Sequence, residues 1–339
     1  MAFIKHKKVA LPVSENLKYY LAKHNRYLAV PIHYSDLLRY SNAIPLYDAE
    51  GEDTLWKTVY YGQSDMTGIY DSLREIYALL NAAGDLSVMK HLYIDRVDLC
   101  SYGNSKPFRV RVVNEINDNF DYFYVKSADA SRVYGLEFED LLSPNRVSYL
   151  VHEQTLVEEH IAGVPADIFI QHYLNDEKIS KIRVGKEFVK FNERCFIRLL
   201  GDMHSSNFVV NIMPDFEETS YRLRAIDFDQ QSYEGHRSVY MPQYFKQNNA
   251  IIQMGIEAMT PETVKQYQKE ERSLIANRIK ASYSKIKSLV GSMKQDHLAP
   301  PENVVTLKTE LAEYYHDKRF IQCKSMGDIM ERSLSLLLE

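Results

Sequence analysis

The stretch that decides the fold lies between residues 200 and 229, in two segments. The first segment reads Leu200-Gly201-Asp202-Met203-His204-Ser205-Ser206-Asn207-Phe208-Val209-Val210, and the second reads Ala225-Ile226-Asp227-Phe228-Asp229. Between them, residues 208–213 and 221–226 form two strand-like runs joined by the polar loop 214–220, which predicts a hairpin. Such a hairpin places Asn207, just before the first strand, beside Asp227, just after the second.

Three oxygen-bearing side chains are therefore expected to meet at one point. The amide of Asn207 and the carboxylate of Asp227 form an oxygen-rich pair suited to Mg²⁺, which is a hard cation. Asp202 precedes Asn207 by five residues and is expected to project from the loop toward the same point. There its carboxylate can accept a proton from an attacking hydroxyl group. An exposed polar turn explains any one of these residues, but not their joint placement.

The pattern Gly-Asp-x-His-x-x-Asn, followed by Ile-Asp-Phe-Asp, resembles the catalytic loop and metal-binding segment of the aminoglycoside phosphotransferase and choline kinase group of the protein-kinase-like superfamily. The core Asp-Met-His-x-x-Asn-Phe is also similar to that of bacterial toxin–antitoxin Ser/Thr kinases. The resemblance implies that Asp202 is the catalytic base and that Asn207 and Asp227 hold the metal. It makes His204 a catalytic-loop residue whose ring orders the loop. Asp229 replaces the glycine of protein kinases and is either a second metal contact or a helix cap.

A phosphoryl-transfer site of this kind also needs a cation on the nucleotide phosphates, held by a carboxylate. Lys126 ends the aromatic strand Tyr-Phe-Tyr-Val-Lys, where the small lobe of a kinase-like fold carries this residue. On the helix that follows, Glu137 falls within an apolar stripe. A carboxylate on such a face needs a partner, and Lys126 is the expected one. Alternatively, Glu137 reaches solvent at the edge of the helix.

The remaining nucleotide contacts are expected from two further segments. Tyr102, Gly103, Asn104 and Ser105 lie between two strand-like segments, where a loop covering the phosphates is expected. The single glycine of this loop departs from the Gly-rich kinase pattern. The strand that contains Glu159 resembles the segment linking the two kinase lobes, whose backbone holds the adenine.

A second register for the nucleotide lysine is also open. Lys57 follows a hairpin turn and precedes a helix that carries Glu75. Lys126 is preferred, because the hairpin before it, the helix after it and the strand 155–161 follow in kinase order.

The coarse pattern along the chain predicts an α+β, two-lobed protein-kinase-like fold with a small antiparallel β-rich N-lobe and a larger helical C-lobe. Residues 1–90 are interpreted as an N-terminal extension of helices and a hairpin, residues 91–165 as the β-rich nucleotide-binding lobe, and residues 166–339 as the helical catalytic and acceptor-binding lobe. Helices are expected over 69–80, 131–142 and 178–199, and one more from Thr260 through Ile286.

Composition narrows the class of protein. The 339 residues are 45% hydrophobic and 26% charged, which is typical of a globular chain with a core. The net charge of −5 gives no global reason to bind nucleic acid or anionic lipid. Three dispersed cysteines and scattered histidines favour neither a disulfide framework nor a zinc site. With no signal peptide or membrane-spanning run in the sequence, we expect a cytoplasmic protein.

The leading hypothesis is therefore an enzyme, an ATP- and Mg²⁺-dependent phosphotransferase acting on a hydroxyl of a small molecule or of a protein Ser/Thr. A catalytically inactive nucleotide-binding scaffold is the alternative, and a metal-dependent phosphoesterase is a third, weaker candidate. The acceptor itself is not specified by the sequence. Acidic and aromatic residues just beyond the metal segment would suit a cationic acceptor, and they are Tyr233, Glu234, Tyr240 and Tyr244.

Overall fold

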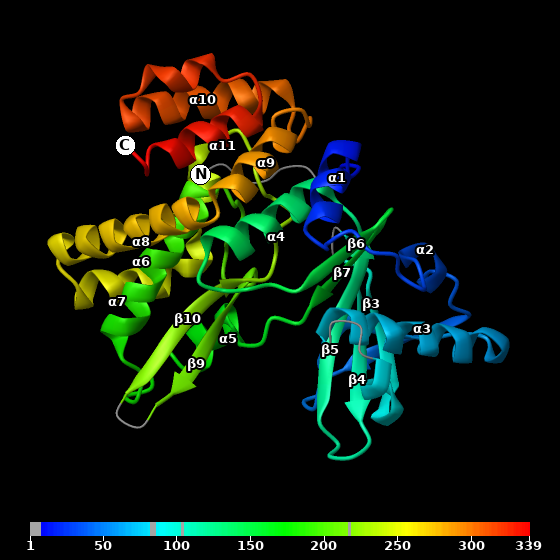
Figure 1. The fold of residues 1–339 in the computed structure, drawn as a ribbon. Coiled ribbons are helices and arrows are strands. Elements are labelled where there is room, and N and C mark those ends of the chain that lie inside the picture. The colour runs from blue at the N-terminus through cyan, green and yellow to red at the C-terminus, as the bar shows by residue number, and fades with distance from the viewer. Residues whose placement is uncertain (1–7, 82–85, 103–104, 216–217) are drawn as a thin grey trace. The chain divides into compact units, whose positions relative to one another are not determined.

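The computed structural model describes residues 8–81, 86–102, 105–215 and 218–339. These residues divide into two compact units (Figure 1). The sheet unit comprises the described residues up to Ala130 together with Val147–His160, and the helical unit comprises Ser131–Arg146 and Ile161–Glu339. The fold is mixed α+β, as the sequence predicted.

The sheet unit is built on one antiparallel sheet of seven strands in the order β1-β2-β3-β4-β5-β7-β6. Its strands are β1 (Asn42–Tyr47), β2 (Asp53–Tyr60), β3 (Leu92–Cys100), β4 (Phe108–Asn114), β5 (Phe120–Ser127), β6 (Tyr149–His152) and β7 (Thr155–Glu159). Its helices are α1 (Glu15–Lys23), α2 (Tyr34–Leu37), α3 (Gln63–Asn81) and the 3₁₀ turn η1 (Leu86–His91). The hairpin expected within residues 1–90 is formed by β1 and β2, and the hairpin expected before Lys126 is formed by β4 and β5. Both are confirmed.

One face of this sheet packs against α3 to form the core of the unit (Figure 1). Alternation along β4 and β5 sends one side chain in two to this face, as a pleated strand requires. Leu73 and Ile76 of α3 are fully buried there, against strand residues such as Val110 and Phe123. Most residues on the opposite parity are polar or aromatic, with the aliphatic Val113 as an exception, and Lys126 is one of the polar ones.

The helical unit contains a small three-stranded antiparallel sheet and most of the helices. Its strands are β8 (Val164–Pro165), β9 (Phe208–Pro214) and β10 (Thr219–Ala225), in the order β10-β9-β8. Its helices are α4 (Ala130–Leu142), α5 (Ala166–His172), α6 (Lys181–Ile197), α7 (Asn249–Ala258), α8 (Pro261–Ala281), α9 (Tyr283–Met293), α10 (Pro301–Tyr315) and α11 (Met326–Ser335). Four 3₁₀ turns complete it: η2 (Arg237–Tyr240), η3 (Pro242–Tyr244), η4 (Lys246–Asn248) and η5 (Lys318–Gln322).

Two buried features hold the helical unit together. Helix α6 lies against both α7 and α8 (Figure 1), and the buried guanidinium of Arg194 bonds Glu187 on its own helix and Glu271 on α8. Helix α4 is buried along almost its whole length. On α4, Glu139 accepts hydrogen bonds from Ser143 and Arg198, so its charge is fully paired inside the unit.

The structure differs from the sequence-based expectations in two places. The helix expected from Thr260 through Ile286 is two helices, because Ser282 leaves the helical conformation between α8 and α9. The units also divide the chain at other points than the segments 1–90, 91–165 and 166–339. Strands β1 and β2 are continuous with the seven-stranded sheet through the pairing of β2 with β3, and α4 beyond Ala130 belongs to the helical unit. Among the described helices, none combines the length and apolar character that crossing a bilayer requires.

Candidate active site

The loop after α6 begins with a tightly held turn. Leu199 and Asp202 both have positive φ angles, 54° and 61°. Leu200 pairs with Gln231 in an isolated antiparallel bridge, and the Gly201 N–H donates to the oxygen of Gln230 across 3.1 Å. A Cβ on Gly201 would stand 3.2 Å from that oxygen, so glycine permits this close approach. The bridge fixes the loop that carries Asp202 against the segment that follows Asp229.

Asn207 joins the two predicted loops. Its Nδ2 donates to the main-chain oxygen of Asp202 across 2.8 Å. Its own main-chain oxygen accepts from the N–H of Ile226 across 3.0 Å, at the base of the β9–β10 hairpin. Because Asp227 follows Ile226 directly, the hairpin brings the two segments of the sequence pattern side by side, as predicted.

A buried arginine contacts both carboxylates of the second segment. Arg132, on α4, is only 2% exposed, and its Nη1 lies 2.9 Å from Oδ1 of Asp227 and 2.8 Å from Oδ1 of Asp229. The main chain of Asp229 also donates to Oδ1 of Asp227 across 3.0 Å. Since Asp229 lies in a turn and bonds the guanidinium, its predicted alternative role as a helix cap is wrong.

Asp202 lies in a negative environment. The pKa of its carboxyl group is raised to about 7, first because burial disfavours the charged form. The charges of Asp227, Glu234 and Asp229 raise it in the same direction, because they lie close enough to repel a carboxylate. A carboxyl group that titrates near neutral pH can both accept and return a proton, which is what a general base needs.

His204 lies beside Asp202 and bonds within its own loop. Its Nε2 is 4.0 Å from Oδ1 of Asp202, and its Nδ1 accepts from the main chain of Ser206 across 3.3 Å. Burial lowers the pKa of His204, although Asp227 and Asp167 oppose this shift. A neutral ring held by a loop N–H fits the ordering role predicted for this residue.

Two of the predicted metal ligands carry side-chain oxygens of the kind that bind Mg²⁺. Asn207 and Asp227 offer amide and carboxylate oxygens, and the Asp227 side chain is 36% exposed. Mg²⁺ in nucleotide sites needs only one or two carboxylates, since phosphates and water complete its shell. Among the described residues, no group of three or more His, Cys, Asp or Glu side chains is arranged to hold a metal. These two donors suit a Mg²⁺ ion whose remaining ligands are phosphate oxygens and water.

The predicted nucleotide lysine lies in the sheet unit. Lys126 is the last residue but one of β5 and is 7% exposed, and its Nζ bonds Oε2 of Glu158 on β7 across 2.7 Å. The partner expected from the sequence, Glu137, is 3% exposed on α4 and belongs to the helical unit. The burial excludes the alternative in which Glu137 reaches solvent, and the pairing of Lys126 with Glu137 stays a prediction. Lys57, the other candidate, is exposed on β2.

The other described residues that were predicted to contact the nucleotide also belong to the sheet unit. Tyr102 is 70% exposed after β3, and Ser105 precedes β4. Gly103 and Asn104 lie outside the described residues, so the predicted phosphate loop stays a prediction. Glu159 ends β7, where its main-chain N–H donates to Ser148 across 3.0 Å.

Of the residues suggested for acceptor binding, Glu234 is the one whose charge raises the pKa of Asp202. Burial raises the pKa of Glu234. Its main-chain oxygen accepts from the buried hydroxyl of Tyr240 across 2.6 Å, and the oxygen of Tyr233 accepts from Asn303 across 2.9 Å. Tyr244 is 45% exposed.

Arg132 was missed by the sequence analysis, although a signal for it exists. Arg132 is a charged residue that directly precedes the pair Val133-Tyr134, in a helix that is otherwise rich in apolar residues. A charge placed there is expected to be paired. Its partners are 95 and 97 residues away, so local pattern alone did not identify them.

Comparison with known proteins gives no family for this chain: no protein-family model matches it, and no match was found among the curated proteins.

Proposed function

We propose that this protein is a phosphotransferase that moves the γ-phosphate of ATP to a hydroxyl group. The observation that carries the proposal is the convergence of Asp202 with Asp227 through Asn207, which binds the loops of both aspartates. The resemblance to aminoglycoside phosphotransferases, choline kinases and toxin–antitoxin kinases rests on these same three residues. The order of hairpin, helix and strand around Lys126 supports a two-lobed kinase-like arrangement.

In this proposal Asp202 orients the acceptor hydroxyl and takes its proton. The raised pKa of Asp202 supports the role, because a base is most effective when its pKa lies near the working pH. Asn207 keeps the loop of Asp202 in register with Asp227, and His204 supports the same loop through its hydrogen bond with the main chain of Ser206. Phosphoryl transfer of this type depends mainly on positioning and on charge stabilisation.

Asn207 and Asp227 are the proposed ligands of Mg²⁺, with Asp229 as a further candidate. When bound with ATP, Mg²⁺ supplies positive charge to the β- and γ-phosphates. Lys126 supplies a second positive charge, and Glu158 and Glu137 are the acids proposed to position it. Tyr102, Gly103, Asn104, Ser105 and the backbone near Glu159 are the proposed remaining contacts to the nucleotide.

One observation favours a second candidate, a nucleotide-binding scaffold without transfer activity. The Arg132 guanidinium already neutralises part of the charge on Asp227 and Asp229. If this ion pair persists in the presence of nucleotide, Asp227 has less charge to offer a metal. The two candidates differ in one measurable respect, since only the enzyme turns over ATP.

The acceptor class follows from the charge around Asp202. Three further carboxylates act on it, from Asp227, Asp229 and Glu234. After a metal ion and Arg132 offset the first two, Glu234 remains beside the proposed base. This favours an acceptor with a hydroxyl and a positive charge, either a small amino-alcohol or a basic peptide segment around Ser or Thr.

The test is transfer of γ-labelled phosphate from Mg·ATP, first to the protein alone and then with a panel of amino-alcohol metabolites. Asp202→Asn is expected to lower transfer by about 10²–10⁴-fold. Asp176→Asn, which removes an exposed turn carboxylate in the same unit, serves as the matched control and is expected to retain wild-type transfer. ATP binding without transfer by the wild type would support the scaffold instead. Equal transfer by both variants would contradict the role of Asp202.

A further inference from the structure

A cavity in the helical unit contains none of the candidate active-site residues. It has a volume of about 490 Å³ and lies among α8, α11, the end of α6 and the end of α10. Cavities of this size accommodate small organic ligands. Its walls combine apolar residues such as Leu336 and Leu337 with a row of basic residues on α8.

The basic row consists of Lys269, Arg272 and Lys280. These positions are spaced by three and eight residues, so they share one face of α8. Arg272 is held by its Nε, which donates to the buried carboxylate of Glu193 across 2.8 Å. Among the described residues, its terminal nitrogens have no hydrogen-bond partner, and Lys269 and Lys280 form no ion pair. No described aspartate or glutamate lines the cavity.

The opposite wall adds an unsatisfied polar group. Ser333, on α11, is 5% exposed, and its hydroxyl has no hydrogen-bond partner in the part of the chain that the structure describes. A buried hydroxyl without a partner is costly, which favours a ligand oxygen at this wall. The Ser333 side chain is among those that line the cavity.

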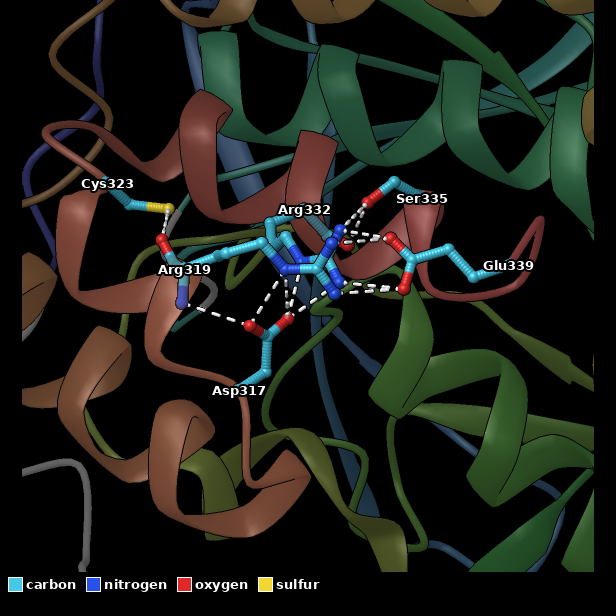
Figure 2. Close-up of polar contacts among 6 residues, drawn as sticks. All are labelled: Asp317, Arg319, Cys323, Arg332, Ser335 and Glu339. Carbon is cyan, nitrogen blue, oxygen red and sulfur yellow. Dashed lines mark hydrogen bonds and ion pairs between the residues drawn. The ribbon is translucent and has the colours of Figure 1, made fainter.

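Helix α11, which contributes Ser333 to the cavity, is anchored by ion pairs of residues that do not line the cavity. Figure 2 shows the guanidinium groups of Arg319 and Arg332 between the carboxylates of Asp317 and Glu339. Asp317 accepts from Arg332 Nε across 2.7 Å and from Arg319 Nε across 2.9 Å. Glu339 accepts from Arg319 and Arg332 across 2.9 and 2.7 Å. These contacts tie the end of α11 to η5, so the cavity has a fixed wall.

We propose that this cavity binds a small phosphate monoester with an aromatic or apolar body. The two unpaired lysines and Arg272 match the charge of a phosphate group, and Ser333 can donate to one of its oxygens. The apolar wall at Leu336 and Leu337 matches the body of the ligand. The site is separate from the proposed transfer chemistry and does not depend on it.

The probe is phenyl phosphate, titrated into the full chain by calorimetry with EDTA present, beside inorganic phosphate and phenol. Phenyl phosphate is expected to bind with a Kd of ~1 mM or tighter, and more tightly than either fragment. Its affinity is expected to fall as salt rises, because exposed charges are screened.

Three variants test the basic row: Lys269→Glu, Lys280→Glu and the double variant that combines them. Lys181→Glu serves as the control. Lys181 is an exposed lysine at the other end of α6, about 24 Å along the helix from the cavity residue Ile197. The double variant is expected to weaken phenyl phosphate binding at least about tenfold, and the control to leave it unchanged. The substituted residues Lys269 and Lys280 are exposed lysines, so circular dichroism is expected to show native folding of the variants. Absence of phenyl phosphate binding, equal weakening by Lys181→Glu, or no weakening by the double variant would each overturn the proposal.

Discussion

Asn207 Nδ2 donates a 2.8 Å hydrogen bond to the main-chain oxygen of Asp202, so the amide of one candidate site residue fixes the backbone of another. That backbone has a φ of 61°, in the left-handed region that few residues adopt without support. The same Asn207 is bonded through its main chain to Ile226, next to Asp227. The contact explains how two loops separated in sequence form one site.

The first prediction concerns this contact. Asn207→Ala removes the donor and leaves the oxygen of Asp202 without it, which is expected to destabilise the protein by about 1–2 kcal/mol. Phosphate transfer is expected to fall much further than this loss of stability explains, because Asp202 and the metal ligand are affected together. Chemical denaturation and a transfer assay on the same preparation measure both. Asn211→Ala, on the half-buried part of β9, is the control, and an equal loss of transfer in that variant would argue against a special role for Asn207.

The second prediction is a stability change that depends on pH. The pKa of Asp202 is raised in the folded protein from 3.8 to about 7, so folding favours the protonated form. The ionised carboxylate therefore costs stability above pH 7, and this cost disappears as pH falls through the folded pKa toward 4. Asp202→Asn is expected to stabilise the protein at pH 8 by up to about 4 kcal/mol and to have little effect at pH 4.

Thermal melts at both pH values check this prediction. Asparagine is a suitable replacement, because it tolerates positive φ and keeps the size of the side chain. If the difference in stability between the variant and the wild type is the same at pH 4 and at pH 8, Asp202 does not titrate as described.

The third prediction concerns the Arg132 bridge. Arg132→Met keeps the length of the side chain and removes the charge that pairs with Asp227 and Asp229. Leaving two partly buried carboxylates without this cation is expected to destabilise the protein by about 3–5 kcal/mol. Urea unfolding measures this change. A loss below about 1 kcal/mol, the value typical of an exposed ion pair, would indicate that solvent already screens these charges.

The fourth prediction separates the two candidate nucleotide lysines. Lys126 is buried and bonded to Glu158, whereas Lys57 is exposed on β2. Lys126→Met is expected to raise the KM for ATP or lower kcat at least about tenfold, since it removes a positive charge proposed to face the phosphates. Lys57→Met is the matched variant and is expected to leave both constants unchanged. The reverse result would assign the role to Lys57.

The variant at Lys126 also leaves Glu158 buried without this partner, which lowers stability. Its kinetics are therefore compared at a temperature where circular dichroism shows the variant folded. Glu158→Gln provides a second control, because it removes the ion pair but keeps the lysine.

The β9–β10 hairpin and the adjacency of Asn207 to the second segment were predictable, because both follow from local alternation and from a short connecting loop. The start of α8 was also predictable from local sequence, since Thr260 caps the helix and a proline occupies its first position. The break at Ser282 was not, because the apolar spacing of the flanking residues continues across it.

Contacts between distant parts of the chain were the hardest to predict. The Arg132 bridge joins residues almost one hundred positions apart, and the Lys126–Glu158 pair is set by the register of β5 against β7. Both depend on which buried charges meet after the strands and helices have packed. That such buried charges need partners could be predicted from the sequence, but the identity of those partners could not.

The most direct test of the proposed site is the binding of Mn²⁺ with ATP, followed by electron paramagnetic resonance. Mn²⁺ replaces Mg²⁺ at oxygen sites and reports the free and bound ion separately. The account predicts that wild-type protein binds Mn·ATP and that Asp227→Asn weakens this binding at least about tenfold, while Asp176→Asn leaves it unchanged. Equal binding of Mn·ATP by wild type and Asp227→Asn would contradict the account, because the metal would then not be held at Asp227.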